Sequence, residues 1–233
     1  MGGLTTDVPK CLVQLGGRPL LEWQVAALRG AGIDTVGIVR GYKAHLLDGR
    51  GLVAFDNPRW METNMVASLR CASAWLREGP AIVSYSDIFY SAATVAALMA
   101  APGDIAISYD PDWLTSWSQR FADPLSDAES FRLSGSRVVD IGRPTIRLEE
   151  VSGQYMGLLR FTKAGWTAAE AHLDNLAVER RDRLDMTGLL SGLIGAGQSV
   201  EAVPLSGSWG EVDNAGDLAL YERLIQRDRL PGL

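Results

Sequence analysis

The stretch Ala81-Ile82-Val83-Ser84-Tyr85-Ser86-Asp87 is an apolar, β-branched run that stops at a carboxylate. A helical pattern precedes it, so we interpret the run as a buried strand of a parallel sheet whose last residue reaches the carboxyl edge of that sheet. Open α/β sheets bind ligands at this edge. Asp87 could therefore hold a divalent cation against a phosphate. It could equally cap the helix predicted for residues 92–101, and the strand alone does not decide between the two roles.

Composition limits the class of protein. The chain has 233 residues, of which 47% are hydrophobic and 21% are charged, and this is enough for one globular domain spanning residues 1–233. The net charge of −6 and the isoelectric point near 5.0 argue against a nucleic-acid partner, which would require a basic face. Two cysteines and two histidines are too few for a disulfide framework or a Cys/His metal centre.

The chain also lacks the usual sequence signals for membranes and secretion. No run approaches the ~18 apolar residues that a membrane span needs, and the first residues have no signal-peptide pattern. We therefore expect no membrane partner and a cytoplasmic location. The oligomeric state is not fixed by the sequence, and a homodimer is one alternative.

The first half of the chain alternates short strands with helices. Strands are predicted at residues 11–15, 35–39, 52–55, 81–87 and 104–109, and helices at 19–30, 42–47, 63–76 and 92–101. Because no hairpin signal separates these strands, they predict an α/β fold in which helices cover both faces of a parallel sheet.

The second half has a different pattern. Residues 127–133 and 137–141 predict an antiparallel pair across Ser134-Gly135-Ser136. Further strands are predicted at residues 155–161 and 199–204, and helices at 163–174, 186–194 and 215–227.

Several separated motifs carry a resemblance to a known superfamily. They are Val8-Pro9-Lys10-Cys11-Leu12-Val13, Gly17-Arg18-Pro19-Leu20-Leu21, the strand-end Asp87, and Trp209-Gly210-Glu211-Val212-Asp213. In this order they resemble the nucleotidyltransferases that make sugar nucleotides and CDP-alcohols. The resemblance implies a Rossmann-like fold of the nucleotide-diphospho-sugar transferase type, with a mostly parallel sheet and a small antiparallel acceptor-side lobe. It implies a nucleotide-binding half at residues 1–109 and an acceptor-binding half at residues 110–233.

Other segments are similar to one branch of that superfamily. They are residues 57–69, Tyr109-Asp110-Pro111-Asp112-Trp113, residues 123–129, and Gly153-Gln154-Tyr155-Met156-Gly157. They resemble cytidylyltransferases that act on phosphocholine or 2-aminoethylphosphonate, most closely the phosphonate enzymes. The resemblance implies a magnesium-dependent reaction between CTP, or another nucleoside triphosphate, and a small phosphorylated or phosphonate acceptor, with release of pyrophosphate.

The resemblance also implies roles for residues around the nucleotide. Asp87 and Asp213 match the two metal-binding aspartates and would hold Mg²⁺, while Lys10 would act as a catalytic residue on the phosphates. Tyr85 and Ser86 would belong to the nucleotide site. Taken alone, Lys10 is a lysine in a polar loop, and most such lysines are only solvated.

An acceptor with a cationic head group needs carboxylates and ring faces around it. Candidates for this acceptor pocket lie in the second half of the chain: Asp110, Trp113, Arg120, Glu129, Gln154 and Tyr155. Each has another interpretation. Trp113 could pack a helix together with Trp117, Asp110 could cap that helix, and Arg120 could meet either the acceptor phosphoryl group or a carboxylate of the protein.

Two other functions fit the same motifs: a sugar-1-phosphate nucleotidyltransferase, and a non-catalytic nucleotide-binding protein on this fold. Proteins of the resemblance begin with a buried strand and a loop of the type Leu-Ala-Ala-Gly-x-Gly-x-Arg, before the segment that matches residues 4–10. The given sequence starts inside that region. We therefore expect the native product to begin about fifteen to twenty residues upstream, and the given chain to bind CTP poorly and to expose two strand edges.

Overall fold

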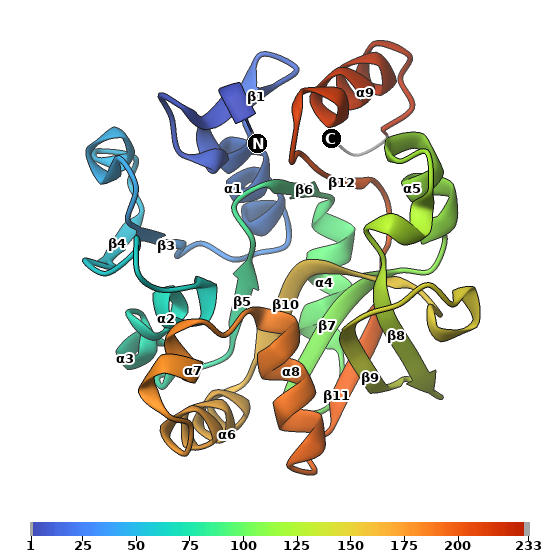
Figure 1. Cartoon of the computed structure of the whole chain (residues 1–233). Coiled ribbons are helices and arrows are strands. Elements are labelled where there is room, and N and C mark those ends of the chain that lie inside the picture. Colours follow the sequence, from blue (N-terminus) through green and yellow to red (C-terminus); the bar gives the residue numbers. More distant parts are fainter. Residues whose placement is uncertain (1, 231–233) are drawn as a thin grey trace.

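A mixed six-stranded sheet lies at the centre of the computed structural model, which describes residues 2–230 (Figure 1). The strand order is β5-β10-β7-β11-β9-β8, and three two-stranded pairs, β1-β2, β3-β4 and β12-β6, surround this sheet. The strands are β1 Gln14–Leu15, β2 Arg18–Pro19, β3 Gly37–Arg40, β4 Val53–Asp56, β5 Ala81–Ser84, β6 Ile88–Tyr90, β7 Ile105–Asp110, β8 Glu129–Ser134, β9 Arg137–Pro144, β10 Gln154–Phe161, β11 Val200–Pro204 and β12 Trp209–Glu211.

Helices cover both faces of this sheet. They are α1 Leu20–Gly30, α2 Met65–Arg70, α3 Ser73–Leu76, α4 Ala92–Ala100, α5 Trp113–Arg120, α6 Lys163–Asp174, α7 Val178–Asp182, α8 Met186–Gly195 and α9 Ala215–Gln226. Short 3-10 helices lie at Gly2–Thr5, Lys10–Leu12, Ala44–Leu47, Pro124–Ser126 and Leu148–Glu150. None of the helices within residues 2–230 is long and apolar enough to cross a membrane.

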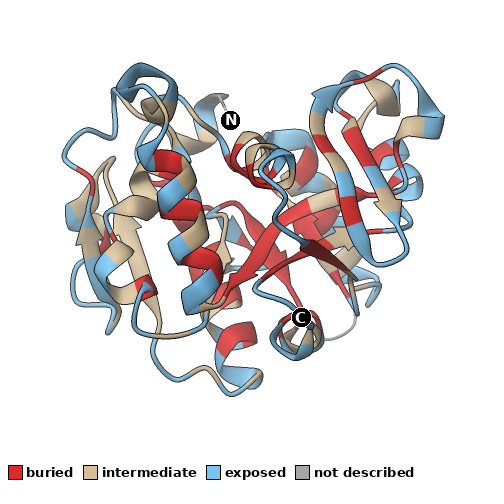
Figure 2. Ribbon diagram, turned by 90° about the horizontal axis from the view of Figure 1, so that it is seen from below, coloured by how far each residue is buried: buried red, intermediate tan, exposed pale blue. Residues whose placement is uncertain are grey.

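Alternation along β7 divides the apolar residues between two cores. Ile105 and Ile107 pack with Trp166 of α6 and Leu189 of α8, whereas Ala106 belongs to the core beside α1 and α4. Successive side chains of a strand point to opposite faces, so one strand supplies both layers. Figure 2 shows these buried strands in the middle of the molecule. The predicted α/β class with helices on both faces is confirmed.

Strand directions are more varied than predicted. β5, β7 and β11 run in one direction, but β10 runs antiparallel between β5 and β7. The composition of β10 explains its central place in the sheet, because Leu158 faces one core while Leu159 and Phe161 face the other. A strand that is apolar on both sides is stable in the middle of a sheet. The predicted antiparallel pair is present as β8 and β9.

The stretch at residues 81–87, predicted as one buried strand, forms a shorter and more exposed strand. β5 ends at Ser84, its residues are only half-buried, and a strand absent from the prediction, β6, starts directly after Asp87. Asp87 therefore lies in the connection between two strands. The alternative role of Asp87 as a helix cap is wrong, because Ser91 caps α4 by accepting a hydrogen bond from the backbone N–H of Thr94.

Two other local predictions differ from the structure. The predicted strand at residues 11–15 is a 3-10 turn followed by the hairpin β1–β2, whose turn residues Gly16 and Gly17 have φ values of 61° and 74°. Glycine adopts such positive φ angles without strain, and they match a tight hairpin turn. The predicted helix at residues 63–76 is divided into α2 and α3, because i→i+3 hydrogen bonds replace the α-helical pattern at Cys71 and Ala72.

A deep cleft separates β3 from β5. Its volume is about 1200 Å³, and it is lined by both strands, by α1 on one side and by α2 and α3 on the other. Within residues 2–230, β3 pairs only with β4, and β5 pairs only with β10. The cleft therefore runs between two strand edges, and one end of it reaches Lys10 and Asp87.

Candidate metal and nucleotide site

The pairing of β6 with β12 brings together Asp87 and Asp213, the two aspartates predicted to hold the metal. Ile88 lies opposite Glu211, and the backbone N–H of Val212 donates to the carbonyl oxygen of Asp87 over 2.9 Å. Asp87 precedes one strand and Asp213 follows the other. Antiparallel strands place such flanking residues side by side, so two carboxylates that are distant in sequence converge on one point.

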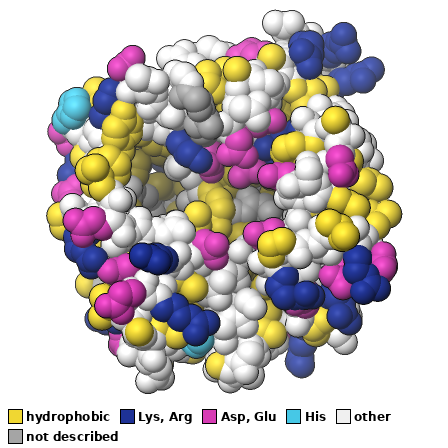
Figure 3. Space-filling view, in the orientation of Figure 1, with side chains coloured by type: hydrophobic (Ala, Val, Ile, Leu, Met, Phe, Trp, Pro, Cys, Tyr) yellow, Lys and Arg dark blue, Asp and Glu magenta, His cyan; other side chains and the backbone are white. Residues whose placement is uncertain are grey.

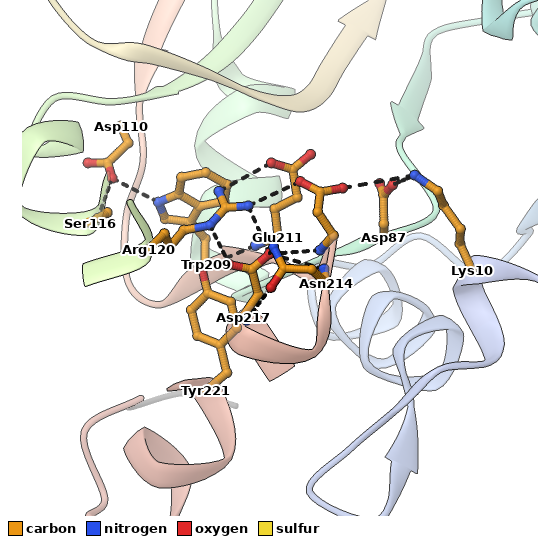
Figure 4. Close-up of polar contacts among 11 residues, drawn as sticks. Lys10, Asp87, Asp110, Ser116, Arg120, Trp209, Glu211, Asn214, Asp217 and Tyr221 are labelled. Atoms are coloured by element: carbon orange, nitrogen blue, oxygen red, sulfur yellow. Dashed lines mark hydrogen bonds and ion pairs between the residues drawn. The ribbon is translucent and has the colours of Figure 1, made fainter. Parts of the chain in front are cut away.

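Three carboxylates make up this point. Asp87, Glu211 and Asp213 each offer an oxygen within 4.8 Å of the others. Lys10 Nζ already lies among them, 2.7 Å from Asp87 Oδ2 and 3.9 Å from Asp213 Oδ1 (Figure 4). The position thus attracts positive charge, and a set of hard oxygen ligands is what Mg²⁺ prefers. The residues present fit a divalent cation.

The charges at this site change the proton affinity of its members. Burial, together with the negative charges of Asp213 and Asp87, raises the pKa of Glu211 from 4.5 to about 8, although Arg120 opposes the shift. Burial alone would lower the pKa of Lys10, but the charges of Asp87, Asp213 and Glu211 and the hydrogen bond to Asp87 together outweigh it, so this pKa lies above its ordinary value. Lys10 is therefore a permanent cation at neutral pH, whereas Glu211 carries a proton unless another cation approaches.

A buried arginine lies behind the carboxylates. The side chain of Arg120 is 1% exposed, and its guanidinium contacts Glu211, Asp213 and Asp217. The acceptor phosphoryl group predicted for Arg120 would have to reach a guanidinium that is enclosed by these three carboxylates.

Gln24 of α1 holds the loop that carries Asp87 in place. The side-chain amide of Gln24 donates to the carbonyl oxygens of Tyr85 and Ile88 over 2.9 and 2.6 Å. Tyr85 and Ser86 line the cleft together with Lys10 and Asp87. Figure 3 shows the hollow in this face of the molecule, with acidic side chains gathered beside it. The structure thus groups all the residues predicted for the nucleotide and the metal, except Asp213, along the wall of the cleft, and Asp213 lies next to them.

Two predicted acceptor residues are held in internal contacts. Asp110 accepts hydrogen bonds from Ser116 Oγ and Trp209 Nε1 over 2.9 and 3.1 Å, and from the backbone N–H of Asp112 over 2.8 Å. Trp113 is buried and packs at an edge-to-face angle on Trp117. These contacts hold the start of α5 against β12, and they leave Asp110 and Trp113 little surface for a ligand.

Tyr85 also contacts a residue predicted for the acceptor. Tyr85 packs edge-to-face on Tyr155 with ring centroids 5.8 Å apart. Burial and, to a smaller extent, the negative charge of Asp185 raise the pKa of Glu129 above its ordinary value. Gln154 donates to the backbone carbonyl of Glu129 over 3.0 Å and thereby fixes the start of β8.

Sequence reasoning missed three residues of this region. Glu211 lay within a quoted motif, but only its neighbour Asp213 was assigned to the metal. Asp217 could have been found from the pattern Asn-x-x-Asp, because Asn214 and Asp217 form a capping box at the start of α9. Asp185 shows no signal beyond that of an ordinary helix cap.

Comparison with known proteins places this fold and site in a family. The chain belongs to the family of the MobA-like NTP transferase domain, whose model matches residues 1–139, and it is a nucleotidyltransferase. It is 30% identical to the CTP:phosphoglutamine cytidylyltransferase of Campylobacter jejuni over 232 residues, covering 92% of this chain and 91% of that protein. It is 29% identical over 96 residues to the 2-aminoethylphosphonate cytidylyltransferase of Lancefieldella rimae, covering 39% of each chain.

Solved structures show the same Rossmann-like fold. The inositol-1-phosphate CTP transferase of T. maritima superposes with a TM-score of 0.73 and 16% identity, covering 96% of this chain and 89% of that one. The CTP:phosphocholine cytidylyltransferase of Streptococcus pneumoniae gives a TM-score of 0.70 and 18% identity, covering 97% and 93%. At these identities the likeness concerns the fold. The predicted superfamily and its nucleotidyltransferase fold are confirmed.

Proposed function

We propose that this protein is a magnesium-dependent cytidylyltransferase that joins CTP to a small phosphate or phosphonate acceptor with a cationic head group. The observation that carries the proposal is the convergence of Asp87, Glu211 and Asp213 beside Lys10 at the end of the cleft. The relatives named for CTP support the choice of nucleotide.

In the proposed reaction an acceptor oxygen attacks the α-phosphorus of CTP, and the bond from that phosphorus to the bridging oxygen of pyrophosphate breaks. Asp87, Glu211 and Asp213 would hold Mg²⁺, which screens the charges of the α-phosphate and the attacking oxygen when it is bound. Lys10 would leave its ion pair with Asp87 and place its ammonium group on the phosphate oxygens. Little covalent chemistry falls to the protein, so alignment and charge compensation are its main contributions.

The acceptor would bind beside the rings of Tyr85 and Tyr155. Glu129, Tyr85 and Tyr155 provide negative charge and ring faces there, and Asp185 adds a second carboxylate. A cationic amine is attracted by such a site through charge and by cation–π contact, worth about 0.5 to 2 kcal/mol per ring. Gln154 supports this pocket by fixing Glu129, and Asp110 and Trp113 support α5 beside it.

Substrate use tests the function directly. At CTP concentrations high enough to offset the weak CTP binding expected above, purified protein should release pyrophosphate with 2-aminoethylphosphonate, phosphocholine or phosphoglutamine. It should use glucose 1-phosphate far less well, because a neutral ring leaves the acidic pocket unpaired. Preference for glucose 1-phosphate would indicate a sugar-1-phosphate nucleotidyltransferase instead. Binding of CTP without turnover of any acceptor would indicate a non-catalytic nucleotide-binding protein.

Substitution of the metal carboxylates tests the site. Asp87→Asn and Asp213→Asn should each lower turnover by two orders of magnitude or more (~10²) without loss of the fold, since each removes a charged ligand. Asp174→Asn is the matched control, because Asp174 is an exposed carboxylate that pairs with Arg70 far from the site. Near-normal turnover in either site variant would remove that residue from the metal centre.

A further inference from the structure

Arg120 occupies an unusual position for a charged side chain. It belongs to α5, and its guanidinium is enclosed between Glu211, Asp213 and Asp217 with 1% of the side chain exposed. The rings of Trp117 and Phe121 cover it at 5.2 and 5.1 Å from the guanidinium carbon. A buried charge is costly unless it is paired, so the arrangement of its partners requires an explanation.

The contacts of Arg120 are directional. Nε donates to Asp217 Oδ1 over 2.9 Å, while Nη2 donates to Asp217 Oδ2 over 3.2 Å and to Asp213 Oδ2 over 3.1 Å. Nη1 reaches Glu211 Oε2 at 3.4 Å (Figure 4). A guanidinium is planar and holds its donors at fixed angles, unlike the single flexible ammonium of lysine. The positions of Glu211 and Asp213 are therefore set by one rigid group.

Asp217 connects the guanidinium to the backbone of the metal site. Its Oδ2 atom accepts hydrogen bonds from the backbone N–H groups of Asp213 and Asn214 over 3.0 and 3.3 Å. Arg120 thus holds Asp213 twice, once through its carboxylate and once through its main chain. Asn214 fixes Asp217 in turn, by a hydrogen bond of 2.9 Å from its side-chain amide.

The charges of the cluster also fit this role. Four carboxylates, Asp87, Glu211, Asp213 and Asp217, surround two cations, Lys10 and Arg120. When all four are ionised, their negative charge exceeds the positive charge of Lys10 and Arg120, so the cluster favours a further cation. Arg120 contacts Asp213 through Oδ2 and so reduces repulsion among the carboxylates, while Asp213 Oδ1 lies 3.9 Å from Lys10 Nζ.

We propose that Arg120 is a positioning residue, which together with Asp217 fixes Glu211 and Asp213 in the arrangement that binds the divalent cation. This inference rests on the metal centre of the proposed function. It assigns Arg120 to the support of the metal ligands and not to the acceptor.

The affinity of the protein for a divalent metal ion distinguishes a positioning role of Arg120 from a purely electrostatic role. Removing a positive charge close to a cation site strengthens metal binding if only Coulomb forces matter. Arg120→Met should instead weaken Mn²⁺ binding to the nucleotide-free protein by about tenfold or more, and Arg120→Lys should weaken it as well, although it keeps the charge. Free Mn²⁺ measured by electron paramagnetic resonance gives the affinity without any need for turnover.

A double variant and a control complete the experiment. Arg120→Met combined with Asp217→Asn removes both charges of the pair and keeps an amide oxygen for the backbone N–H groups of Asp213 and Asn214, so it protects the fold while still releasing the carboxylates of Glu211 and Asp213. It should show the same loss of Mn²⁺ affinity as Arg120→Met. Arg77→Met removes another arginine that grips a carboxylate, Glu170, and should leave Mn²⁺ affinity unchanged.

The outcomes are distinct. Unchanged or tighter Mn²⁺ binding in Arg120→Met, or normal binding in the double variant, overturns the positioning role. In turnover assays the Mg²⁺ concentration needed for half-maximal rate should rise in Arg120→Lys, while the KM of the acceptor stays constant. A rise in the acceptor KM alone would contradict the proposal and return Arg120 to the acceptor site. If the wild-type protein binds Mn²⁺ but uses no acceptor, the proposed function fails and the positioning role stands.

Discussion

The carboxyl group of Glu211 lies between two other carboxylates and one guanidinium. Its side chain is 25% exposed, so solvent screens these neighbours only in part. Burial and the repulsion from Asp213 and Asp87 make ionisation unfavourable, and a bound cation would reverse that balance. One carboxyl group therefore links the protonation state of the site to its metal content.

Stability against pH tests this link in the metal-free protein. The pKa of Glu211 is about 8 in the folded protein and near 4.5 in the unfolded chain, so folding retains a proton between these values. The stabilising contribution is fully present below pH 4.5 and is lost as pH rises to about 8. Glu211→Gln should flatten this part of the curve of unfolding free energy against pH. An equal slope in both proteins would place the titration elsewhere.

Lys10 is the residue on which nucleotide binding should depend most directly. Its side chain is 44% exposed and already pairs with Asp87. Lys10→Met should lower turnover by about 100-fold, since a cation facing a developing charge is lost, and Lys10→Arg should restore part of the rate. Lys163→Met, which changes an exposed lysine on α6, serves as the control in pyrophosphate-release assays. Full activity of Lys10→Met would show that this lysine is only solvated.

Among the elements, the first turn of α9 has two tasks. Asn214 and Asp217 satisfy backbone N–H groups in a capping box, and the same Asp217 binds Arg120 and the main chain of Asp213. The start of a helix is thus also the support of the metal site. A cap elsewhere in the molecule, Thr162 at the start of α6, also donates to Asp104 but contacts none of the metal-site carboxylates.

Variants of these two caps distinguish the contribution of a cap to stability from its contribution to Mg²⁺ use. Asn214→Ala and Thr162→Ala should each cost about 1 kcal/mol of unfolding free energy, since each loses a helix cap. Only Asn214→Ala should also raise the Mg²⁺ concentration needed for half-maximal turnover, because Asp217 then loses the hydrogen bond from the Asn214 side-chain amide. Chemical denaturation and a Mg²⁺ titration of activity measure the two effects. Equal effects of both variants on Mg²⁺ use would exclude a special role for the α9 cap.

Across the whole molecule, the cleft interrupts the layer of strands. On β3, the carbonyl oxygens of Val36 and Arg40 accept bonds from the β4 side, so the peptide groups of the alternate residue Val39 point away from β4. On β5, Tyr85 bonds to Gly157, so the alternate residue Ile82 points its N–H away from β10. Both strands therefore turn backbone donors toward the cleft, whose wall they form.

Amide hydrogen exchange should reveal these edges. The amides of Val39 and Ile82 should exchange much faster than the amide of Ile107, which lies on β7 between two paired strands and is fully buried. Exchange followed by nuclear magnetic resonance or by mass spectrometry of fragments provides the comparison. Equal protection at all three positions would mean that the edges of the cleft are covered in solution.

Much of the local structure could be predicted because local patterns encode it. The helices predicted in the second half, α6, α8 and α9, follow apolar periodicity and begin at capping residues, and α6 occupies the predicted residues 163–174. Predictions were less accurate where the formation or direction of a strand depends on the strands that pair with it. The short strand β6 is stabilised by β12, which is remote in sequence, and the direction of β10 depends on the two strands beside it.

The sequence by itself determined the α/β class, the acidic character, most helices and the motifs that contain Lys10, Asp87 and Asp213. Only the tertiary structure decided how these residues meet. Lys10 and Asp87 are 77 positions apart, and Arg120 and Asp217 are 97 apart, yet both pairs are in direct contact. Such contacts arise from strand pairing and helix packing, which depend on the whole chain, and local spacing does not encode them. Glu211 as a third carboxylate and Arg120 as its support therefore emerge only from the folded molecule.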